Sequence, residues 1–247
     1  MSAPQVTTRD DGAVRILMLS RPDRKNAMTP QMLTEALAEV QRCKTDGKAL
    51  VVAGEGDTFC AGFDMKMVHE QPRVLADLLT GLSTLIRALR RLEAPVVVAA
   101  HGAAVAGGCA LLGGADVAVT NVDAKLGYPV VKLGVSPAVN GPSLSSAVGF
   151  GPARRMMLDP SLISGREAYR IGLAHHCCDT AAEVLPKSLQ IAHHLAAWDR
   201  ANWATTKRDL NDFDGSSNDD AFDKALAASM SLVGSPDQLA RVAALWA

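Results

Sequence analysis

The sequence predicts an α/β fold, in which strands and helices alternate in the first part of the chain and helices alone form the last part. Residues 94–100 (APVVVAA) are continuously apolar, which is typical of a strand buried on both faces. Residues 74–92 carry leucines at helical spacing, and from residue 181 onward the chain is predicted to be helical. A chain of 247 residues is long enough to bury one sizeable core.

The elements before residue 94 follow this alternation. Residues 13–19 and 49–53 are short apolar runs, and we predict a strand for each. Between them, residues 29–42 form a predicted helix with Thr29 as its N-cap and Pro30 at its first position. The predicted helix over residues 74–92 has an apolar face made of Leu75, Leu78, Leu79, Leu82, Leu85, Ile86 and Leu89.

A pair of glycines follows the buried strand. Gly102 turns the chain, and a helix beginning near Ala106 has Gly107 and Gly108 in its first turn. The first N–H groups of a helix have no partner within it and lie at the positive end of its dipole. Because these glycines have no Cβ, a ligand carbonyl can approach the amides closely. The segment predicts a backbone oxyanion hole, although a Gly-Gly pair is also typical of tight packing between helix and sheet.

Shorter elements follow the glycine pair. We predict one strand and three helices, at residues 116–119, 142–149, 152–158 and 166–171. The region after residue 181 is helical with breaks at residues 214–218 (DGSSN) and 234–236. No low-complexity linker divides the chain, so we place a core at residues 1–180 and a helical C-terminal region at residues 181–247.

Composition excludes several classes of partner. A net charge of -1 argues against nucleic-acid binding. The start of the chain (MSAPQVTTRDDG) has no apolar signal region, and no window approaches about 18 uninterrupted apolar residues, so we expect no membrane association. Five cysteines, an odd number without framework spacing, favour free thiols and a cytoplasmic location.

The run HHCC at residues 175–178 does not predict a metal site. Adjacent residues on a strand point to opposite faces, so four in a row cannot converge on one tetrahedral ion. We expect a short strand here and no metal site. His193 and His194 are expected at the boundary between core and solvent on an amphipathic helix.

Five segments resemble the motifs of the crotonase (enoyl-CoA hydratase/isomerase) family, in the family's order and spacing. They cover about the first three-quarters of the chain and are SRPDRKNAMTPQM (20–32), LVVAGEGDTFCAGFDMK (50–66), APVVVAAHGAAVAGGCALLGGADVAV (94–119), LGYPVVKLGVSP (126–137) and GREAYRIGLAHH (165–176). The resemblance implies a ββα spiral core followed by a helical C-terminal trimerisation region. It also implies an acyl-CoA thioester as substrate or ligand, no further cofactor, and a homotrimer or a dimer of trimers.

The resemblance assigns roles to particular residues. The two oxyanion amides are those of Phe63 and Gly107. The CoA-binding residues are Arg24, Lys25, Ala27, Ala61, Asp64, Met65 and Lys66. The acyl pocket is formed by Gly108, Ala110, Tyr128, Val130, Ser136 and Asn140.

The basic residues of this set are expected to replace a missing segment. Relatives usually carry a basic segment after the last helix that helps to hold the CoA phosphates, whereas this sequence ends at Leu245-Trp246-Ala247. We therefore expect the phosphate contacts to come from Arg24, Lys25 and Lys66. The alternative is that these three are solvated surface charges.

The sequence departs from the family at the two positions where hydratases carry glutamates, which fall on Ala110 and Val130. From residue 94 to residue 158 the only carboxylates are Asp116 and Asp123, and Asp116 matches a structural family residue. General acid or base assistance contributes about a hundredfold to ten-thousandfold in rate. Ordinary hydration by paired carboxylates is therefore not expected. Small residues at 110 and 130 would suit a bulky or branched acyl group.

Several other groups have two interpretations each. Cys109 in the first helical turn is either a low-pKa thiolate or plain packing. Strand alternation would place Tyr128, Val130 and Lys132 on one face, with Tyr128 either donating to an acyl group or satisfied in the core. Ser136 or Asn140 could hold a polar acyl tail or a water molecule.

Two histidines complete this set. His69 either reaches the pocket mouth or lies on a surface helix, the second being the simpler interpretation. His101 precedes Gly102 and is expected to order the turn.

Three functional hypotheses follow. The first is an enzyme that acts on an acyl thioester through the oxyanion hole without a glutamate pair, by decarboxylation, thioester hydrolysis or isomerisation through another base. The second is a non-catalytic acyl-CoA binder. The third is a structural protein that retains only the trimeric scaffold. Open backbone amides favour the first two hypotheses, and turnover separates those two.

Overall fold

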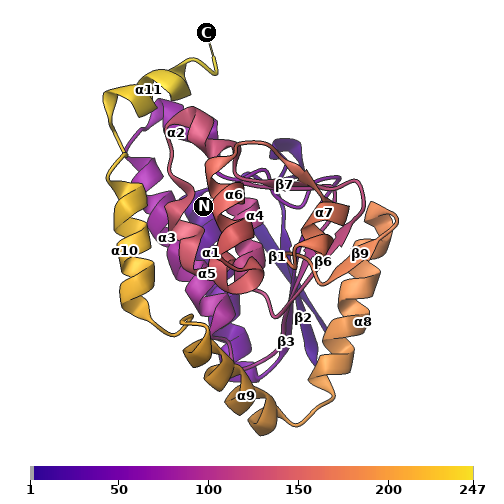
Figure 1. The fold of residues 1–247 in the computed structure, drawn as a ribbon. Coiled ribbons are helices and arrows are strands. Elements are labelled where there is room, and N and C mark those ends of the chain that lie inside the picture. The colour runs from indigo at the N-terminus through magenta and orange to yellow at the C-terminus, as the bar shows by residue number, and fades with distance from the viewer. Residues whose placement is uncertain (1–2, 247) are drawn as a thin grey trace.

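A six-stranded sheet forms the centre of the protein (Figure 1). The computed structural model describes residues 3–246. The strand order is β1-β2-β3-β4-β6-β9, with β1 and β2 antiparallel and the other neighbours parallel. The strands are β1 (Val6–Asp11), β2 (Val14–Leu19), β3 (Ala49–Gly54), β4 (Val96–Ala100), β6 (Val117–Asn121) and β9 (His176–Cys178).

A smaller three-stranded sheet lies beyond the end of β4. Its order is β5-β7-β8, formed by β5 (Ala103–Val105), β7 (Lys125–Gly127) and β8 (Ile163–Ser164). β5 follows β4 after a turn at Gly102, whose φ of +64° favours glycine. The chain passes through β5 from the end of β4 to the predicted glycine pair.

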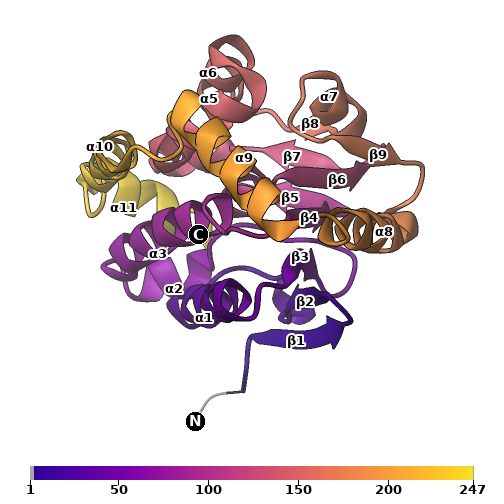
Figure 2. The same cartoon turned by 90° about the horizontal axis from the view of Figure 1, so that it is seen from below.

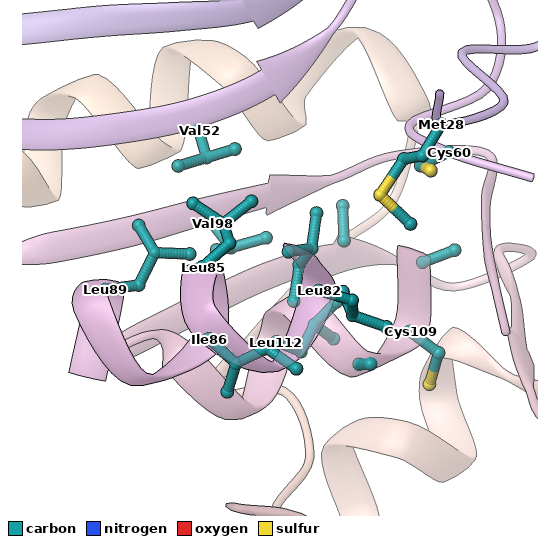
Figure 3. Packing of buried hydrophobic residues seen from close by; sticks show 14 of the residues in the cluster. Met28, Val52, Cys60, Leu82, Leu85, Ile86, Leu89, Val98, Cys109 and Leu112 are labelled. Atoms are coloured by element: carbon teal, nitrogen blue, oxygen red, sulfur yellow. The ribbon is translucent and has the colours of Figure 1, made fainter. Parts of the chain in front are cut away.

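Helices cover both faces of the main sheet. Figure 2 shows α1 (Pro30–Asp46) and α3 (Val74–Arg90) on one side and α8 (Val184–Ala196) on the other. Because side chains alternate along each strand, Val52 and Val98 join the core under α3, whereas Val51 and Val97 join the core under α8. Figure 3 shows Leu85 and Leu89 of α3 packed near Val52 and Val98.

The remaining helices surround the smaller sheet and the edge of α3. Their bounds are α2 (Met65–Glu70), α4 (Gly107–Ala110), α5 (Gly141–Val148), α6 (Phe150–Leu158), α7 (Gly165–Arg170), α9 (Arg200–Phe213), α10 (Asp219–Met230) and α11 (Pro236–Ala243). The 3₁₀ helices are η1 (Pro22–Arg24), η2 (Leu111–Gly114), η3 (Pro129–Leu133), η4 (Pro137–Asn140) and η5 (Ala181–Glu183). In the C-terminal region, α10 packs against α3 and η4, and α11 packs against α2 and η3.

The α/β class with C-terminal helices is confirmed. Several helices and strands also begin where short sequence patterns predict them. Thr29 caps α1 by accepting a hydrogen bond from the Met32 N–H (3.1 Å), and Pro30 begins that helix. The predicted strand in HHCC is β9. The helix expected near Ala106 is α4, which begins at Gly107. The division at residues 180 and 181 stays a prediction.

Two expectations about local structure were wrong. Residues 129–133 form the 3₁₀ helix η3 rather than a strand that alternates Tyr128, Val130 and Lys132. Pro129 begins this turn and has no N–H for a sheet ladder, and Gly134 ends it at a φ of +69°. The helical region after residue 181 also breaks at residues 197–199, where Asp199 caps α9 by accepting from the Asn202 N–H (2.8 Å).

Within residues 3–246, no helix combines the length and the apolar character needed to cross a membrane.

Candidate active site

Two loops, at residues 24–28 and 59–64, are bound to each other beside the end of β5. The Met28 N–H donates to the Gly62 carbonyl (2.7 Å), and the Asp64 N–H donates to the Met28 carbonyl (2.9 Å). On its other edge the second loop pairs with β5, since the Val105 N–H donates to the Cys60 carbonyl (2.9 Å). The loop at residues 59–64 is therefore held along both edges by main-chain hydrogen bonds.

Backbone strain is concentrated at this place. Among residues 3–246, the non-glycine residues with positive φ are Lys25 (50°), Asn26 (53°) and Ala106 (54°). Asn26 is fully buried, and its amide donates to the carbonyls of Glu55 and Thr58, both at 2.8 Å. Such conformations persist only where the surroundings impose them, and they are common at functional sites.

Two main-chain N–H groups at this place have no internal acceptor. None of the described residues accepts a hydrogen bond from the N–H of Phe63 or from that of Gly107, the first residue of α4. The two segments are in contact, because a Cβ built on Gly62 would lie 3.6 Å from the Gly107 nitrogen and 2.9 Å from the Ala106 Cβ. The positive end of α4 and two unpaired donors thus lie together.

Both glycines of the pair are also tightly packed. A Cβ on Gly108 would lie 2.4 Å from the Cys60 carbonyl oxygen. A Cβ on Gly107 would lie 2.4 Å from the Met28 Cε and 3.3 Å from the Phe63 Cε1. Figure 3 shows Met28 and Cys60 near one another. The first turn of α4 therefore has both features that the glycine pair predicts. The Cα atoms of Gly107 and Gly108 are closely packed, and the Gly107 N–H has no acceptor among the described residues.

Two adjoining cavities open at this turn. An outer vestibule of about 530 Å³ lies between the loop after β3, β5, η3 and α11. An inner pocket of about 30 Å³ lies between α3, α4 and η4. Phe63, Ala106, Val130 and Val135 line both cavities and mark their junction. No aspartate, glutamate or histidine is among the described residues that line either one.

A buried polar network closes the inner pocket. The Asn140 amide donates to the Tyr128 hydroxyl, and the Ser143 hydroxyl donates to the Asn140 side-chain oxygen (2.5 Å). Burial raises the pKa of the Cys109 thiol to about 11, although a hydrogen bond from Tyr128 opposes the shift. Burial also raises the pKa of Tyr128 well above its ordinary value. The low-pKa interpretation of Cys109 is therefore wrong, and Tyr128 is a satisfied core tyrosine that lines the pocket.

The two cavities bring together residues from all three predicted sets, those of the oxyanion hole, the CoA-binding site and the acyl pocket. Ala61, Phe63, Met65 and Val130 line the vestibule. Gly107, Ala110, Tyr128, Ser136, Asn140 and again Val130 line the inner pocket. Gly108 faces Cys60 instead and lines neither cavity. Sequence reasoning missed Leu79, Leu82 and Val139 of the inner wall, since they come from α3 and η4 and carry only the apolar signal of any core residue.

The predicted basic residues are exposed and are not among those that line the vestibule, and their contact with CoA phosphates stays a prediction. Arg24, Lys25 and Lys66 do not line the vestibule, and the exposed Lys66 is 3.8 Å from Glu70. The cations that do line it are Lys132 and Arg241, of which Arg241 is bound to Asp237 (2.7 Å). Arg241 was missed because only the return of α11 toward α2 and η3 brings it there.

Two predicted CoA-binding residues, Ala27 and Asp64, make internal contacts, and their binding of CoA stays a prediction. Asp64 caps α2 by accepting from the Met67 N–H (3.2 Å) and pairs with Arg21 (2.9 Å). The Ala27 carbonyl accepts a hydrogen bond from the same Arg21 (2.5 Å). Neither residue lines the vestibule, so both order the loops that surround it.

Three further groups have structural surroundings. Asp116 accepts from the Val96 N–H (2.7 Å) and pairs with the buried Lys207 (2.7 Å), as expected of a structural carboxylate. The His101 ring nitrogen hydrogen-bonds the Gly56 carbonyl (3.0 Å), which ties the turn at Gly102 to the loop after β3. His69 stacks on Trp246 with ring centroids 4.8 Å apart. No group of three His, Cys, Asp or Glu residues in the described part of the chain is placed to hold a metal ion.

Comparison with known proteins agrees with this architecture. The model of the enoyl-CoA hydratase/isomerase family matches residues 9–235. The short-chain-enoyl-CoA hydratase of Clostridium acetobutylicum is 28% identical over 202 residues, which cover 80% of this chain and 77% of that protein. The crotonyl-CoA hydratase of Syntrophomonas wolfei is 29% identical over 200 residues, covering 79% and 76%.

A solved structure extends the likeness to nearly the whole chain. The crystal structure of an enoyl-CoA hydratase/isomerase from Xanthobacter autotrophicus Py2 matches with a TM-score of 0.89 and 27% identity, covering 99% of this chain and 94% of that one. The fold is thus the crotonase fold with its C-terminal helices. The protein belongs to the enoyl-CoA hydratase/isomerase family.

Proposed function

We propose that the protein processes an acyl-CoA thioester by stabilising its enolate with the N–H groups of Phe63 and Gly107, without a carboxylate acid–base pair. The observation that carries this proposal is the pair of unpaired amides beside two cavities whose described lining includes no Asp, Glu or His. Each preorganised donor to a developing oxyanion contributes about a hundredfold to a thousandfold in rate. The family of the chain supports the thioester as ligand.

Decarboxylation is the reaction that such a site supports best. In a malonyl-type thioester the bond between C2 and the carboxylate carbon breaks, its electron pair moves into the thioester as an enolate, and CO2 leaves. The enolate oxygen accepts from the two amides until C2 takes a proton from solvent. The enolate forms here without a protein base, whereas hydration requires positioned proton transfer. Thioester hydrolysis, or isomerisation through another base, belongs to the same class.

A non-catalytic acyl-CoA binder is the second candidate. The absence of a lining carboxylate favours it as much as it favours decarboxylation, and the vestibule of about 530 Å³ is large enough to hold part of a CoA ester. Only a measurement of turnover distinguishes a binding protein without catalytic activity from an enzyme that uses the two amides.

We also propose a homotrimer or a dimer of trimers. Large apolar side chains on the surface support association, with Phe150 84% exposed and Phe213 85% exposed. Light scattering of the purified protein measures this directly, and a monomer at micromolar concentration would contradict it. The cytoplasmic location stays a prediction.

The test of function is incubation with a panel of 2-enoyl, 3-enoyl, 3-hydroxyacyl and malonyl-type CoA thioesters, followed by chromatography and mass spectrometry. Gly107→Pro removes one amide at a first helical position, where proline is tolerated. Gly107→Ala is the matched control, because it keeps the N–H and adds a Cβ that, like that of proline, meets the ends of the Met28 and Phe63 side chains.

The two variants separate the outcomes. We expect loss of CO2 from the malonyl-type member, and a rate about a hundredfold lower in Gly107→Pro than in Gly107→Ala. Equal rates in both variants would contradict the role of the Gly107 amide. Absence of any product, with acyl-CoA that stays bound through gel filtration, would establish the binding protein instead.

A further inference from the structure

The residue before Gly107 has a backbone conformation that L-amino acids rarely adopt. Ala106 has a φ of 54° and a ψ of -117°. Lys25, by comparison, has a φ of 50° with a ψ of 38°, which is the left-handed region that other residues occasionally use. Ala106 lies outside that region and close to the mirror image of the β region, which glycine adopts without strain. Position 106 thus carries a methyl group where the backbone favours glycine.

The main chain on both sides holds Ala106 in this conformation. Its N–H donates to the Gly127 carbonyl of β7 (2.8 Å), and its carbonyl accepts from the Ala110 N–H (3.0 Å). The preceding residue, Val105, donates to the Cys60 carbonyl (2.9 Å). The chain is therefore fixed as a strand before position 106 and as a helix after it, and the strain falls on the residue between them.

The methyl group of Ala106 lies against Gly62, the residue before Phe63. A Cβ built on Gly62 would come within 2.9 Å of the Ala106 Cβ, so the methyl group occupies the space beside the Gly62 Cα. Gly62 also has a positive φ, of +96°. The two unpaired amides, those of Phe63 and Gly107, directly follow these two residues. The Ala106 methyl group therefore separates the two segments that carry the amides, at a place where Ala106 lines both cavities.

We infer that Ala106 is a positioning residue, whose methyl group sets the spacing between the N–H groups of Phe63 and Gly107. This inference rests on the proposed function, in which both amides bind the same thioester oxygen. Two donors stabilise a developing oxyanion together only if both reach it at hydrogen-bond distance. The strained backbone places the methyl group between the two segments, so the protein gives up some stability to hold the donors at this spacing.

A glycine at position 106 separates the two effects of this residue. Ala106→Gly allows the same φ and ψ without strain but removes the methyl group between the segments. We expect kcat for the active thioester to fall about tenfold or more, with KM within about twofold of the wild-type value, because a misplacement of about 1 Å costs up to about a hundredfold in rate. The melting temperature should not fall, since relief of strain offsets the loss of a buried methyl group.

Ala118→Gly is the matched control. Ala118 is fully buried in β6, is not among the described residues with positive φ, and lines neither cavity. The substitution removes the same methyl group from an unstrained strand, so the melting temperature should fall by about 3–7 °C while kcat stays at the wild-type value. Ala106→Ser keeps the Cβ in place and should restore kcat to within about threefold of the wild type.

A spectroscopic probe follows the two donors without turnover. The probe is butyryl-CoA with an isotopic carbon label at the thioester carbonyl, an ester that has no carboxylate to lose. Hydrogen bonds to this oxygen weaken the carbonyl bond and move its infrared band to lower frequency. We expect a lower frequency in the wild-type complex than in the free ester, and less than half of that shift in the saturated Ala106→Gly complex.

The outcomes separate the inference from the function on which it rests. If butyryl-CoA does not bind the wild-type protein, or binds without a shift of its carbonyl band, the proposed function fails and the inference fails with it. If the wild-type shift is present and Ala106→Gly retains it in full, only the positioning role is overturned. A melting temperature that falls in Ala106→Gly as far as in Ala118→Gly, or a variant that does not fold, would show that position 106 does not store strain, and would overturn the inference as well.

Discussion

The two sides of the candidate active site are built in different ways. The amide side consists of the loop at residues 59–64 and the start of α4, and main-chain hydrogen bonds hold that loop along both edges. The facing side consists of η3 and α11, where a short 3₁₀ turn between Pro129 and Gly134 presents valine and leucine side chains. One side thus offers fixed dipoles, and the other offers a mostly apolar surface that also carries Lys132 and Arg241.

The difference explains which chemistry the site can support. Fixed donors stabilise a developing charge without reorganising when the charge appears. The valine and leucine side chains of the facing side strengthen that effect by excluding water, but they cannot give or take a proton. A reaction in which the substrate produces its own carbanion therefore suits this site better than one that depends on positioned proton transfer.

The largest expected effect comes from disturbing the amide side with Gly108→Ala. The new Cβ would lie 2.4 Å from the Cys60 carbonyl oxygen, and Cys60 cannot move cheaply because it pairs with β5. A displacement of about 1 Å in α4 costs about a hundredfold in rate, and overpacking costs about 1–3 kcal/mol of stability. Turnover of the active thioester and thermal melting measure the two effects.

Gly151→Ala is the matched control for this change. No atom lies within 4 Å of a Cβ at Gly151, an exposed residue of α6. Its melting temperature and turnover should stay at or slightly above the wild-type values. If Gly108→Ala behaved like this control, the amide side would not be the rigid half of the site.

The facing side can be tested by adding the carboxylate that it does not have. Val130 lines both cavities, so Val130→Glu places an acid at their junction. We expect hydration of crotonyl-CoA to rise from the wild-type level by up to about a hundredfold, the lower end of what positioned acid–base groups contribute. Val130→Gln has nearly the same shape without the acid, and an equal gain in that variant would contradict the explanation.

The pH dependence of wild-type turnover tests whether either side of the site carries an acid–base group. The titratable groups of the inner network, Cys109 and Tyr128, both have a pKa raised by burial, to about 11 for Cys109. Both stay protonated between pH 6 and pH 9, so kcat for decarboxylation should change by less than about threefold across that range. A bell-shaped profile with limbs inside this range would indicate an acid–base group other than Cys109 and Tyr128.

Which parts of the fold were predictable depends on the range of the interactions that form them. Thr29 caps α1 through the N–H of a residue three positions later, and β4 is a continuous apolar run, so both are readable from neighbouring residues. The η3 turn differs from the strand expected around Val130. Pro129 and Gly134 flank this segment, and they are turn signals that oppose a strand.

The candidate site was predictable where the motifs are contiguous. The glycine pair and the loop containing Phe63 are in contact, as the resemblance of the two contiguous motifs to the crotonase family implies. The walls of the inner pocket and the contribution of Arg241 to the vestibule depend on α3 and α11, which are far away in the sequence. No local pattern distinguishes Leu82 as a pocket residue from Leu85 as a plain core residue.

The smallest expected effect concerns the attachment of α11, which carries the outer part of the facing side. Leu245 lines the vestibule, and the next residue, Trp246, stacks on His69 of α2 with an interplanar angle of 16°. Stacked aromatic pairs contribute about 0.5–1.5 kcal/mol beyond the area they bury, so Trp246→Ala should loosen the end of the chain without unfolding the core. We expect acyl-CoA to bind about two- to fivefold more weakly, at an unchanged melting temperature. His69→Phe keeps an aromatic ring and should bind as the wild type does. If Trp246→Ala instead abolished binding, α11 would be as rigid a part of the site as the amide side, and the contrast between the two sides would not hold.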